Sequence, residues 1–249
     1  ALPNGRLYVT RQSGALQRML PDGGEVAGAG SVNNARGRLA LAPAGKTIIY
    51  SGDGSMWAFK SNNFDDPPTR IVDRQNLGPV LFTSSLAYFG DSLGLEWSDP
   101  RANPTVGRAK TAPAAGITAF GGRVFWATTE GTVHTMRSAD PDPTMSSRLE
   151  LPTTYPAFTS IAVTSTRIYV GAPGHGLVIY EYDATTFAVK SEHLVPADKI
   201  TAVVADETHA YALDAPSNAR VLRVKPDGTE LVVLAAGLAT ENALLLAGD

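Results

Sequence analysis

Short runs of β-branched and aromatic residues recur along the chain, and polar turns separate them. The clearest example is 159–183, which reads TSIAVTSTRIYVGAPGHGLVIYEYD. An apolar run at Ile161–Val163 is followed by a polar turn, then by Arg167–Val170, a Gly/Pro turn and Leu177–Tyr182. Runs of this length with turn residues between them predict three strands in a meander.

The same pattern returns about every 40 residues, and a repeat of that length with four strands is typical of a β-propeller blade. Six units of this kind account for the whole chain. The sequence therefore predicts an all-β, six-bladed β-propeller of four-stranded antiparallel blades, in a single domain over residues 1–249. The aromatic residues that mark the units are Tyr8, Tyr50, Tyr88, Phe125, Tyr169 and Tyr211.

The first unit begins in mid-pattern, because Arg6–Thr10 has the character of a second strand. We predict its missing first strand at the other end of the chain, over Asn242–Leu246. The C-terminal strand would then complete the N-terminal blade and close the ring, which leaves no long open edge at the join.

Other expected strands include Ser55–Lys60, Ile117–Phe120, Arg123–Thr128, Arg148–Leu151, Phe187–Val195 and His209–Leu213. Trp57, Trp97 and Trp126 are expected to fill the spaces between blades. Arg6, Arg123 and Arg167, which begin second strands, are expected to be residues of the repeat structure. The 24 glycines and 17 prolines interrupt the chain too often for amphipathic spacing over more than ten residues, so we expect no long helix. The segment Asp140–Thr144 is expected to be a loop.

Composition restricts the classes of partner. The chain is 43% hydrophobic and 18% charged, with a net charge of -3, and it has no long basic or acidic run. We therefore expect neither a nucleic-acid partner nor a polybasic membrane patch. No apolar run reaches the roughly 18 residues of a membrane helix, so no membrane span is expected. Cysteine is absent, which excludes disulfides, thiolate metal sites and a cysteine nucleophile.

The first residue is Ala1 rather than methionine. The simplest interpretation is a leader removed by signal peptidase, or by the way the chain was produced. The corresponding expectation is an exported, secreted or periplasmic, monomeric bacterial protein.

Three stretches resemble degenerate blades of the YWTD type: Leu7–Thr10, Val124–Ala127 and Ala210–Asp214. Six-bladed propellers with NHL-like or TolB-like repeats are similar. The resemblance implies the fold. The full Tyr-Trp-Thr-Asp tetrad does not occur, and neither the Trp-Asp ending of WD40 repeats nor the double glycine of kelch repeats recurs.

The chain is also similar in size to six-bladed lactonases of the gluconolactonase type, and that resemblance implies a calcium ion on the channel axis. Calcium needs several converging oxygen ligands. The inner strands are mostly apolar or hydroxylic, and such ligands come only from Asn33, Asn34, Glu241 and Asn242. We assign no metal, no cofactor and no catalytic residue.

Loops that join one blade to the next share a face with the turns between second and third strands, and ligands of closed rings usually bind at that mouth. His175, between two glycines, is the one histidine on this face, whereas His134 is expected to be packed or on an outer blade face. The residues predicted to bind a ligand are Asn34, Arg74, Tyr155, Lys199, Glu241 and Asn242.

The leading hypothesis is a non-enzymatic module that binds a small molecule, a glycan or a protein at this face. The alternative is a lactonase or lyase acting at the channel mouth, and a third is a scaffold excised or engineered from a longer chain. Acidic and amide groups converging on the axis would favour the enzyme. A shallow groove with exposed aromatic side chains such as Tyr155 would favour the binding module.

Overall fold

The computed structural model describes residues 7–10, 16–19, 27–29, 39–41, 47–52, 55–60, 69–73, 78–83, 86–99, 105–215 and 219–238. Side chains are described for Arg70 and for 78–83, 86–99, 107–215 and 219–236. The chain divides into two compact units, and the division falls between residues 108 and 109. The expectation of one domain over residues 1–249 stays a prediction.

The described strands, β1 to β23, pair into six antiparallel sheets, one three-stranded and five four-stranded. In each sheet, strands that follow one another in the sequence are hydrogen-bonded neighbours. This meander topology is the one that the alternation of short strands and turns predicts, and the all-β class is confirmed.

The first unit contains the sheets β1–β3 and β4–β7 and most of the sheet β8–β11, with β4 lying beside β8. Its strands are β1 (Leu7–Thr10), β2 (Leu16–Met19), β3 (Ala27–Ala29), β4 (Leu39–Leu41), β5 (Thr47–Gly52), β6 (Ser55–Lys60), β7 (Thr69–Asp73), β8 (Val80–Phe82), β9 (Ala87–Asp91), β10 (Gly94–Ser98) and β11 (Thr105–Lys110).

Buried aromatic rings and a buried ion group hold the sheet β8–β11 together. Tyr88 and Trp97 are cross-strand partners with ring centroids 6.3 Å apart, and both are almost fully buried. The Arg108 guanidinium pairs with the Asp91 carboxylate at 2.9 Å and also with Glu96. Buried charges are tolerated only when they are paired in this way.

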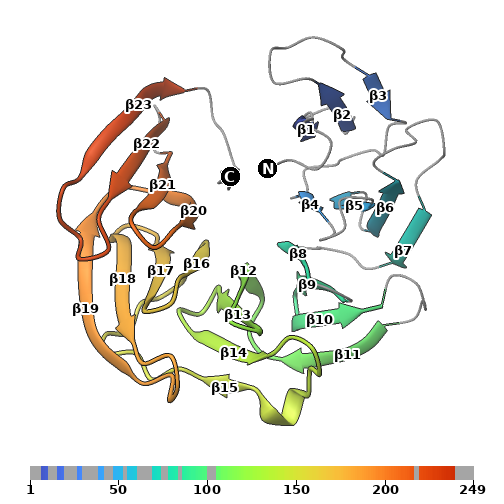
Figure 1. The fold of residues 1–249 in the computed structure, drawn as a ribbon, viewed down its shortest axis with the longest axis horizontal. Coiled ribbons are helices and arrows are strands. Elements are labelled where there is room, and N and C mark those ends of the chain that lie inside the picture. The colour runs from blue at the N-terminus through green and yellow to red at the C-terminus, as the bar shows by residue number, and fades with distance from the viewer. Residues whose placement is uncertain are drawn as a thin grey trace. The chain divides into compact units, whose positions relative to one another are not determined.

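The second unit contains three four-stranded sheets. In Figure 1 their first strands lie together, whereas their last strands form the outer rim of the unit. The strands are β12 (Ala114–Phe120), β13 (Arg123–Thr128), β14 (Val133–Arg137), β15 (Ser147–Arg148), β16 (Ile161–Val163), β17 (Arg167–Ala172), β18 (Gly176–Tyr182), β19 (Val189–Pro196), β20 (Ile200–Ala205), β21 (Ala210–Asp214), β22 (Ala219–Val224) and β23 (Val232–Leu238).

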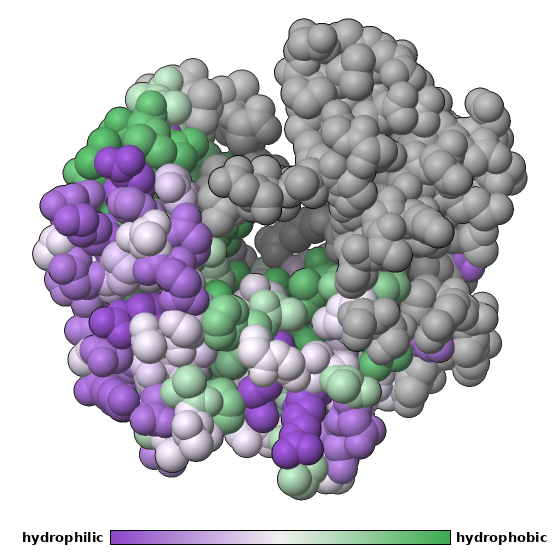
Figure 2. All heavy atoms as spheres, in the orientation of Figure 1, coloured by the Kyte–Doolittle hydropathy of each residue, from purple (hydrophilic) through white to green (hydrophobic). Residues whose placement is uncertain are grey.

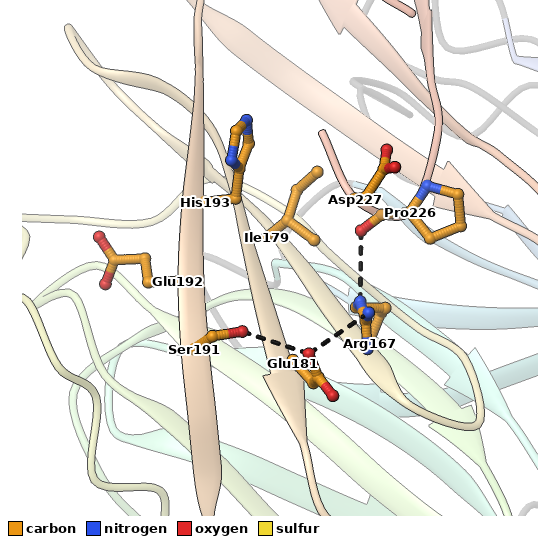
Figure 3. Close-up of a pocket in the computed structure, with 8 residues that line it drawn as sticks. All are labelled: Arg167, Ile179, Glu181, Ser191, Glu192, His193, Pro226 and Asp227. Carbon is orange, nitrogen blue, oxygen red and sulfur yellow. Dashed lines mark hydrogen bonds and ion pairs between the residues drawn. The ribbon is translucent and has the colours of Figure 1, made fainter. Parts of the chain in front are cut away.

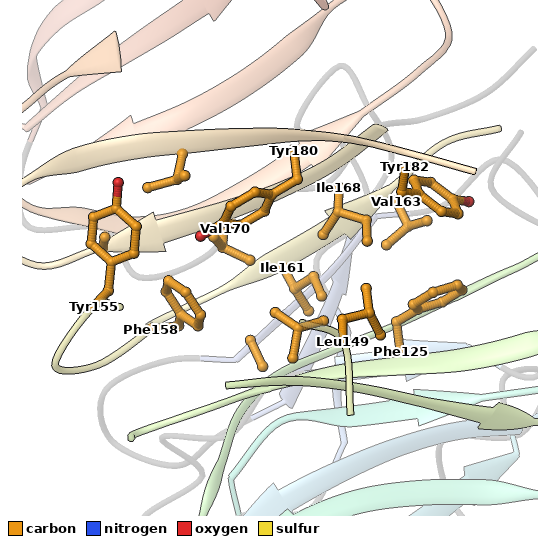
Figure 4. Packing of buried hydrophobic residues seen from close by; sticks show 14 residues of the cluster. Phe125, Leu149, Tyr155, Phe158, Ile161, Val163, Ile168, Val170, Tyr180 and Tyr182 are labelled. Atoms are coloured by element: carbon orange, nitrogen blue, oxygen red, sulfur yellow. The ribbon is translucent and has the colours of Figure 1, made fainter. Parts of the chain in front are cut away.

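The middle sheet, β16–β19, is covered by a hydrophobic cluster on each face. Successive side chains of a strand point to opposite faces. Ile168 and Val170 therefore join a cluster with Phe125 of the preceding sheet (Figure 4), whereas Tyr169 joins a second cluster with Leu222 of the following sheet. Since both faces are buried, β16, β17 and β18 are mostly apolar rather than alternating, whereas the outer strand β19 is largely exposed and polar.

Four predicted strands have different boundaries in the structure. The outer strand of the middle sheet begins at Val189 rather than Phe187, because Phe187 has φ +61° and lies in the turn before it. The preceding sheet's first strand begins earlier, at Ala114, and its last strand is Ser147–Arg148, which leaves Leu149 in the core. Strand β21 is Ala210–Asp214, one residue later than predicted.

Within the described residues the one helical element is a 3-10 turn, Pro143–Met145, which the Asp142 carboxylate caps. It lies in the predicted loop at Asp140–Thr144. No helix in the described part is long and apolar enough to span a membrane. The strand predicted over Asn242–Leu246 lies outside the described residues, so ring closure stays a prediction.

Candidate functional site

Four connecting segments of the second unit touch one another in sequence order. They are the turn 129–131, the segment 152–159 before β16, the turn 173–175 and the segment 197–199 before β20. We call them together the loop face. The sequence predicted this grouping, because each segment either joins one sheet to the next or connects a second strand to a third.

Backbone contacts fix the segments of the loop face. Phe158 N–H donates to the Thr128 carbonyl at 3.0 Å, and Gly174 N–H donates to the Asp198 carbonyl at 3.3 Å. At Gly131, where φ is +70°, a Cβ atom would lie only 1.8 Å from the Tyr155 carbonyl oxygen. The close approach of the two backbones therefore requires glycine at this position.

Tyr155 is only 4% exposed and lies at one end of the cluster in Figure 4. Its hydroxyl donates to Glu192 Oε1 of β19 at 2.7 Å, which ties the loop to the outer strand. Burial, together with the hydrogen bond to Glu192 and its charge, raises the pKa of Tyr155 to about 12. Because the phenol stays protonated near neutrality, it acts as a donor and not as a base.

Tyr180 lies opposite Glu192 in the ladder. Burial, followed by the charge of Glu192, raises the pKa of Tyr180 above its ordinary value. The Tyr180 hydroxyl and Glu192 Oε2 are both buried and have no hydrogen-bond partner within the described part of the chain. Sequence reasoning missed Glu192. The cross-strand register of β18 and β19 places it beside Tyr180.

His175 and Lys199 are exposed on the loop face, as are other side chains that include Glu130, Thr154 and Asp198. The ring of His175 meets the edge of Tyr155 at 5.3 Å between centroids, and the rest of the imidazole faces solvent. Lys199 is held by its backbone, because its N–H donates to Asp214 Oδ1 at 2.7 Å and its carbonyl accepts from Ala215. The Lys199 side chain is exposed.

Two of the predicted ligand-binding residues, Tyr155 and Lys199, lie on the loop face. Tyr155 contacts His175, and Lys199 follows Asp198, whose carbonyl accepts from Gly174. Since Tyr155 is buried, its ring does not offer the exposed aromatic surface that a binding groove there would need. The other four predicted residues lie outside the described residues, as does the candidate calcium-ligand set, and their roles stay predictions. They are Asn34, Arg74, Glu241 and Asn242.

No group of three acidic, histidine or cysteine side chains suited to a metal occurs among the residues that the structure describes. His134 is packed, which is one of the two alternatives that the sequence left open: its ring stacks on Trp126 at 5.2 Å between centroids. The Nε2 atom lies 3.0 Å from Thr132 Oγ1. Trp97 and Trp126 are both buried, as predicted for large rings in the core.

We expect His134 to make the fold sensitive to acid. Burial, followed by the charge of Arg148, lowers the pKa of His134 to about 4. An unfolded histidine titrates near 6.5, so between these values the unfolded chain binds more protons and stability falls as pH falls. Between pH 7 and 5, wild type should lose about 1–2 kcal/mol more than His134→Gln in urea unfolding. Equal losses would contradict this assignment.

A hollow of about 210 Å³ lies between the middle sheet and the turn before β23 (Figure 3). It is on the face of the middle sheet that packs against the sheet β20–β23. Arg167 donates to the Pro226 carbonyl at 3.2 Å and pairs with Glu181 at 3.4 Å. Glu181 also accepts from Ser191. Of the other carboxylates that line the hollow, Glu192 accepts from Tyr155 and Asp227 accepts from Thr229. Each of these charged groups already has a partner, so the hollow offers little charge to a ligand.

The arginines that begin second strands have a repeated structural role in this unit. The Arg123 guanidinium lies 4.3 Å from the centroid of the Phe187 ring, which belongs to the following sheet. Arg167 likewise donates to the Pro226 carbonyl of the sheet that follows its own. Each contact joins a second strand to the turn between the third and fourth strands of the following sheet. The prediction that these arginines belong to the repeat structure agrees with this geometry.

No known family profile matches the sequence, and no curated protein matches it. Solved structures do. One from "Crystal Structure of Mitotic Checkpoint Complex" has a TM-score of 0.72 at 12% identity and covers 95% of this chain and 75% of its own. "Structure of U3-55K" has a TM-score of 0.68 at 10% identity and covers 94% and 78%. "Crystal structure of RRP9 WD40 repeats" has a TM-score of 0.67 at 10% identity and covers 93% and 77%.

At these identities the likeness establishes the fold, which is a β-propeller. The likeness to WD40 repeats arises without a recurring Trp-Asp ending in the sequence. Blade architecture depends on strand alternation and turn chemistry, and these can be satisfied by many sequences. The blade number and the resemblance to YWTD, NHL or TolB-like propellers are not part of this finding.

Proposed function

We propose that the protein is a non-enzymatic binding module that holds a protein partner on its loop face. One observation carries the proposal: the loop face exposes the side chains of His175 and Lys199 on a backbone that is held in place. The close contact of Gly131 with Tyr155 and the hydrogen bond from Lys199 N–H to Asp214 hold that backbone. Rigid scaffolds that present polar loop residues are typical binding surfaces.

The solved relatives support a protein as the partner. One of the three similar structures is part of a multiprotein complex by its printed description, and another is a set of WD40 repeats. The Tyr155–Glu192 pair supports binding rather than catalysis, because a protonated phenol and a carboxylate that is already hydrogen-bonded are used to hold the loop.

Six blades belong to the same proposal. The six sheets of described strands support that number, and Asn242–Leu246 supplies a further apolar strand that would complete the β1–β3 sheet. The YWTD-like stretches Val124–Ala127 and Ala210–Asp214 fall on β13 and β21, the second strands of their sheets. Export from a bacterial cell also stays a prediction, which fractionation of the native host would test.

The test is capture from an extract of the native host on the immobilised full chain. We expect the double variant His175→Ala, Lys199→Glu to retain at least ten-fold less of the captured protein than wild type, a loss of about 1.4 kcal/mol or more. Lys110→Glu is the matched control, because Lys110 is an exposed lysine on β11. Equal retention by all three proteins would refute the proposal.

A further inference from the structure

Strand β23 (Val232–Leu238) is an uncharged apolar strand at the outer rim of its sheet. It pairs with β22 and with no other described strand, and its sequence is VVLAAGL. Val233 and Leu234 are each 49% exposed, Leu231 is 47% exposed and Val232 37%. Val232 and Val233 are the ladder partners of Arg223 and Leu222 and point to opposite faces, so both faces of the strand are uncovered there, whereas the register shifts from Leu234 onwards. Figure 2 shows this region as a continuous hydrophobic area at the upper left.

The last strands of the other sheets differ from β23. Strands β3 and β15 contain only three and two residues. Strands β7 and β11 carry the exposed charges of Arg70 and Lys110, and β19 carries Lys190 and Glu192. Short length, charge and β-bulges are usual means of preventing an edge strand from pairing with another chain. The β22–β23 ladder shifts register twice beyond Val233, so the regular part of the β23 edge is its beginning. Of the last strands described, β23 alone combines seven residues with no charge.

The backbone of β23 can accept a further strand. In an antiparallel pair, alternate amide and carbonyl groups of an edge strand point away from its neighbour. A segment added to such an edge gains affinity from backbone hydrogen bonds and specificity from alternate side chains. Exposed valine and leucine side chains on both faces favour a partner with apolar residues at alternating positions.

Two observations indicate the occupant. β23 itself carries no charge, and Lys225 and Glu230 in the turn before it pair with each other at 2.5 Å. The half-buried Arg223 of β22 is the ladder partner of Val232, on the side away from the free edge, so that edge offers no charge to a charged segment. Four half-exposed side chains also cannot supply the roughly 800 Å² that each partner contributes to a standard interface. The patch is therefore too small for a second folded copy, whereas a single strand needs only the edge.

We propose that β23 binds an extended, uncharged segment of a partner protein, rich in valine, isoleucine and leucine, as a fifth strand of the sheet. This inference rests on the proposed role as a binding module. It adds a second contact for the partner, away from the loop face.

The probe is a library of random decapeptides displayed on phage and selected on the full chain. We expect uncharged sequences with alternating β-branched residues to be enriched. A synthetic peptide from this set, with terminal lysines for solubility, should bind wild type one to one and bind Val233→Lys at least ten-fold more weakly. Val232→Lys tests the opposite face and should weaken binding similarly. Leu194→Lys is the matched control, because Leu194 is a 39% exposed leucine on β19.

Three results would overturn the inference. They are selection without enrichment of uncharged strand-forming peptides, equal peptide binding by wild type and Val233→Lys, and a dimer of the full chain that Val233→Lys dissociates, which would make a second copy the occupant. Thermal unfolding checks that each variant is folded. Lys199→Glu separates this inference from the proposed function of the loop face. It should reduce capture of the partner protein and leave binding of the decapeptide to β23 unchanged.

Discussion

Replacing Asp214 by alanine is expected to lower the free energy of unfolding by about 2–4 kcal/mol. The Asp214 side chain is fully buried at the end of β21. It accepts from Lys199 N–H at 2.7 Å and from Arg220 Nε and Nη2 at 2.9 and 2.8 Å. Alanine would leave these donors unpaired, but Arg220 is 38% exposed and can reach water, which keeps the loss below that of a fully buried pair.

Urea unfolding of Asp214→Ala, Asp214→Asn and Asp198→Ala measures this effect. The asparagine variant keeps an acceptor for Lys199 N–H and should lie between wild type and the alanine variant. Asp198 is exposed on the same segment, so its alanine variant should change stability by less than about 0.5 kcal/mol. If Asp214→Ala were as stable as Asp198→Ala, the Asp214 network would not be what holds this part of the loop face.

Gly131→Ala is expected to destabilise the fold by about 3 kcal/mol or more, from backbone strain and steric conflict together. The position has φ +70°, and a Cβ atom there would lie 1.8 Å from the Tyr155 carbonyl oxygen and 2.7 Å from its carbonyl carbon. Both contacts are with backbone, so no side-chain rotation relieves them. The Tyr155 segment must move, and its hydroxyl would then be drawn away from Glu192.

Gly122→Ala is the control for this prediction. Gly122 has φ +73°, and a Cβ atom there would meet nothing within 4 Å. Alanine at Gly122 should therefore show only the cost of the left-handed conformation, about 1 kcal/mol. Equal thermal shifts for the two variants would show that the contact between Gly131 and Tyr155 is not needed for the fold.

The sequence predicted the strands well because each depends on local chemistry. Runs such as Arg123–Thr128 and Ser55–Lys60 are bounded by turn residues, and the structure reproduces both ends. Prediction failed where a side chain overrides the local pattern. Phe187 reads as the start of a strand, yet its N–H donates to the Asp183 carbonyl at 2.7 Å, in a turn whose Thr185 and Thr186 N–H groups donate to the Asp183 carboxylate. Its ring then stacks on Tyr182 and lies beneath Arg123. The contact with Arg123, 64 residues away, leaves no local signal.

The candidate site was predicted less completely. The order of strands and turns indicated that Tyr155, His175 and Lys199 belong to one face, and that grouping follows from topology alone. It could not show that the Tyr155 ring is buried or that its partner is Glu192, 37 residues away in the chain. Asp214 ends the YWTD-like stretch Ala210–Asp214, but the sequence did not indicate that it is the buried acceptor that fixes the Lys199 backbone.

The most direct test of the account is cross-linking of the captured partner to the lysines of this chain, followed by mass spectrometry. The account predicts cross-links from Lys199 on the loop face. Cross-links confined to lysines on strands, such as Lys110 and Lys190, would contradict binding at the loop face. Cross-links from Lys225 alone would also contradict it, while agreeing with a segment bound beside β23.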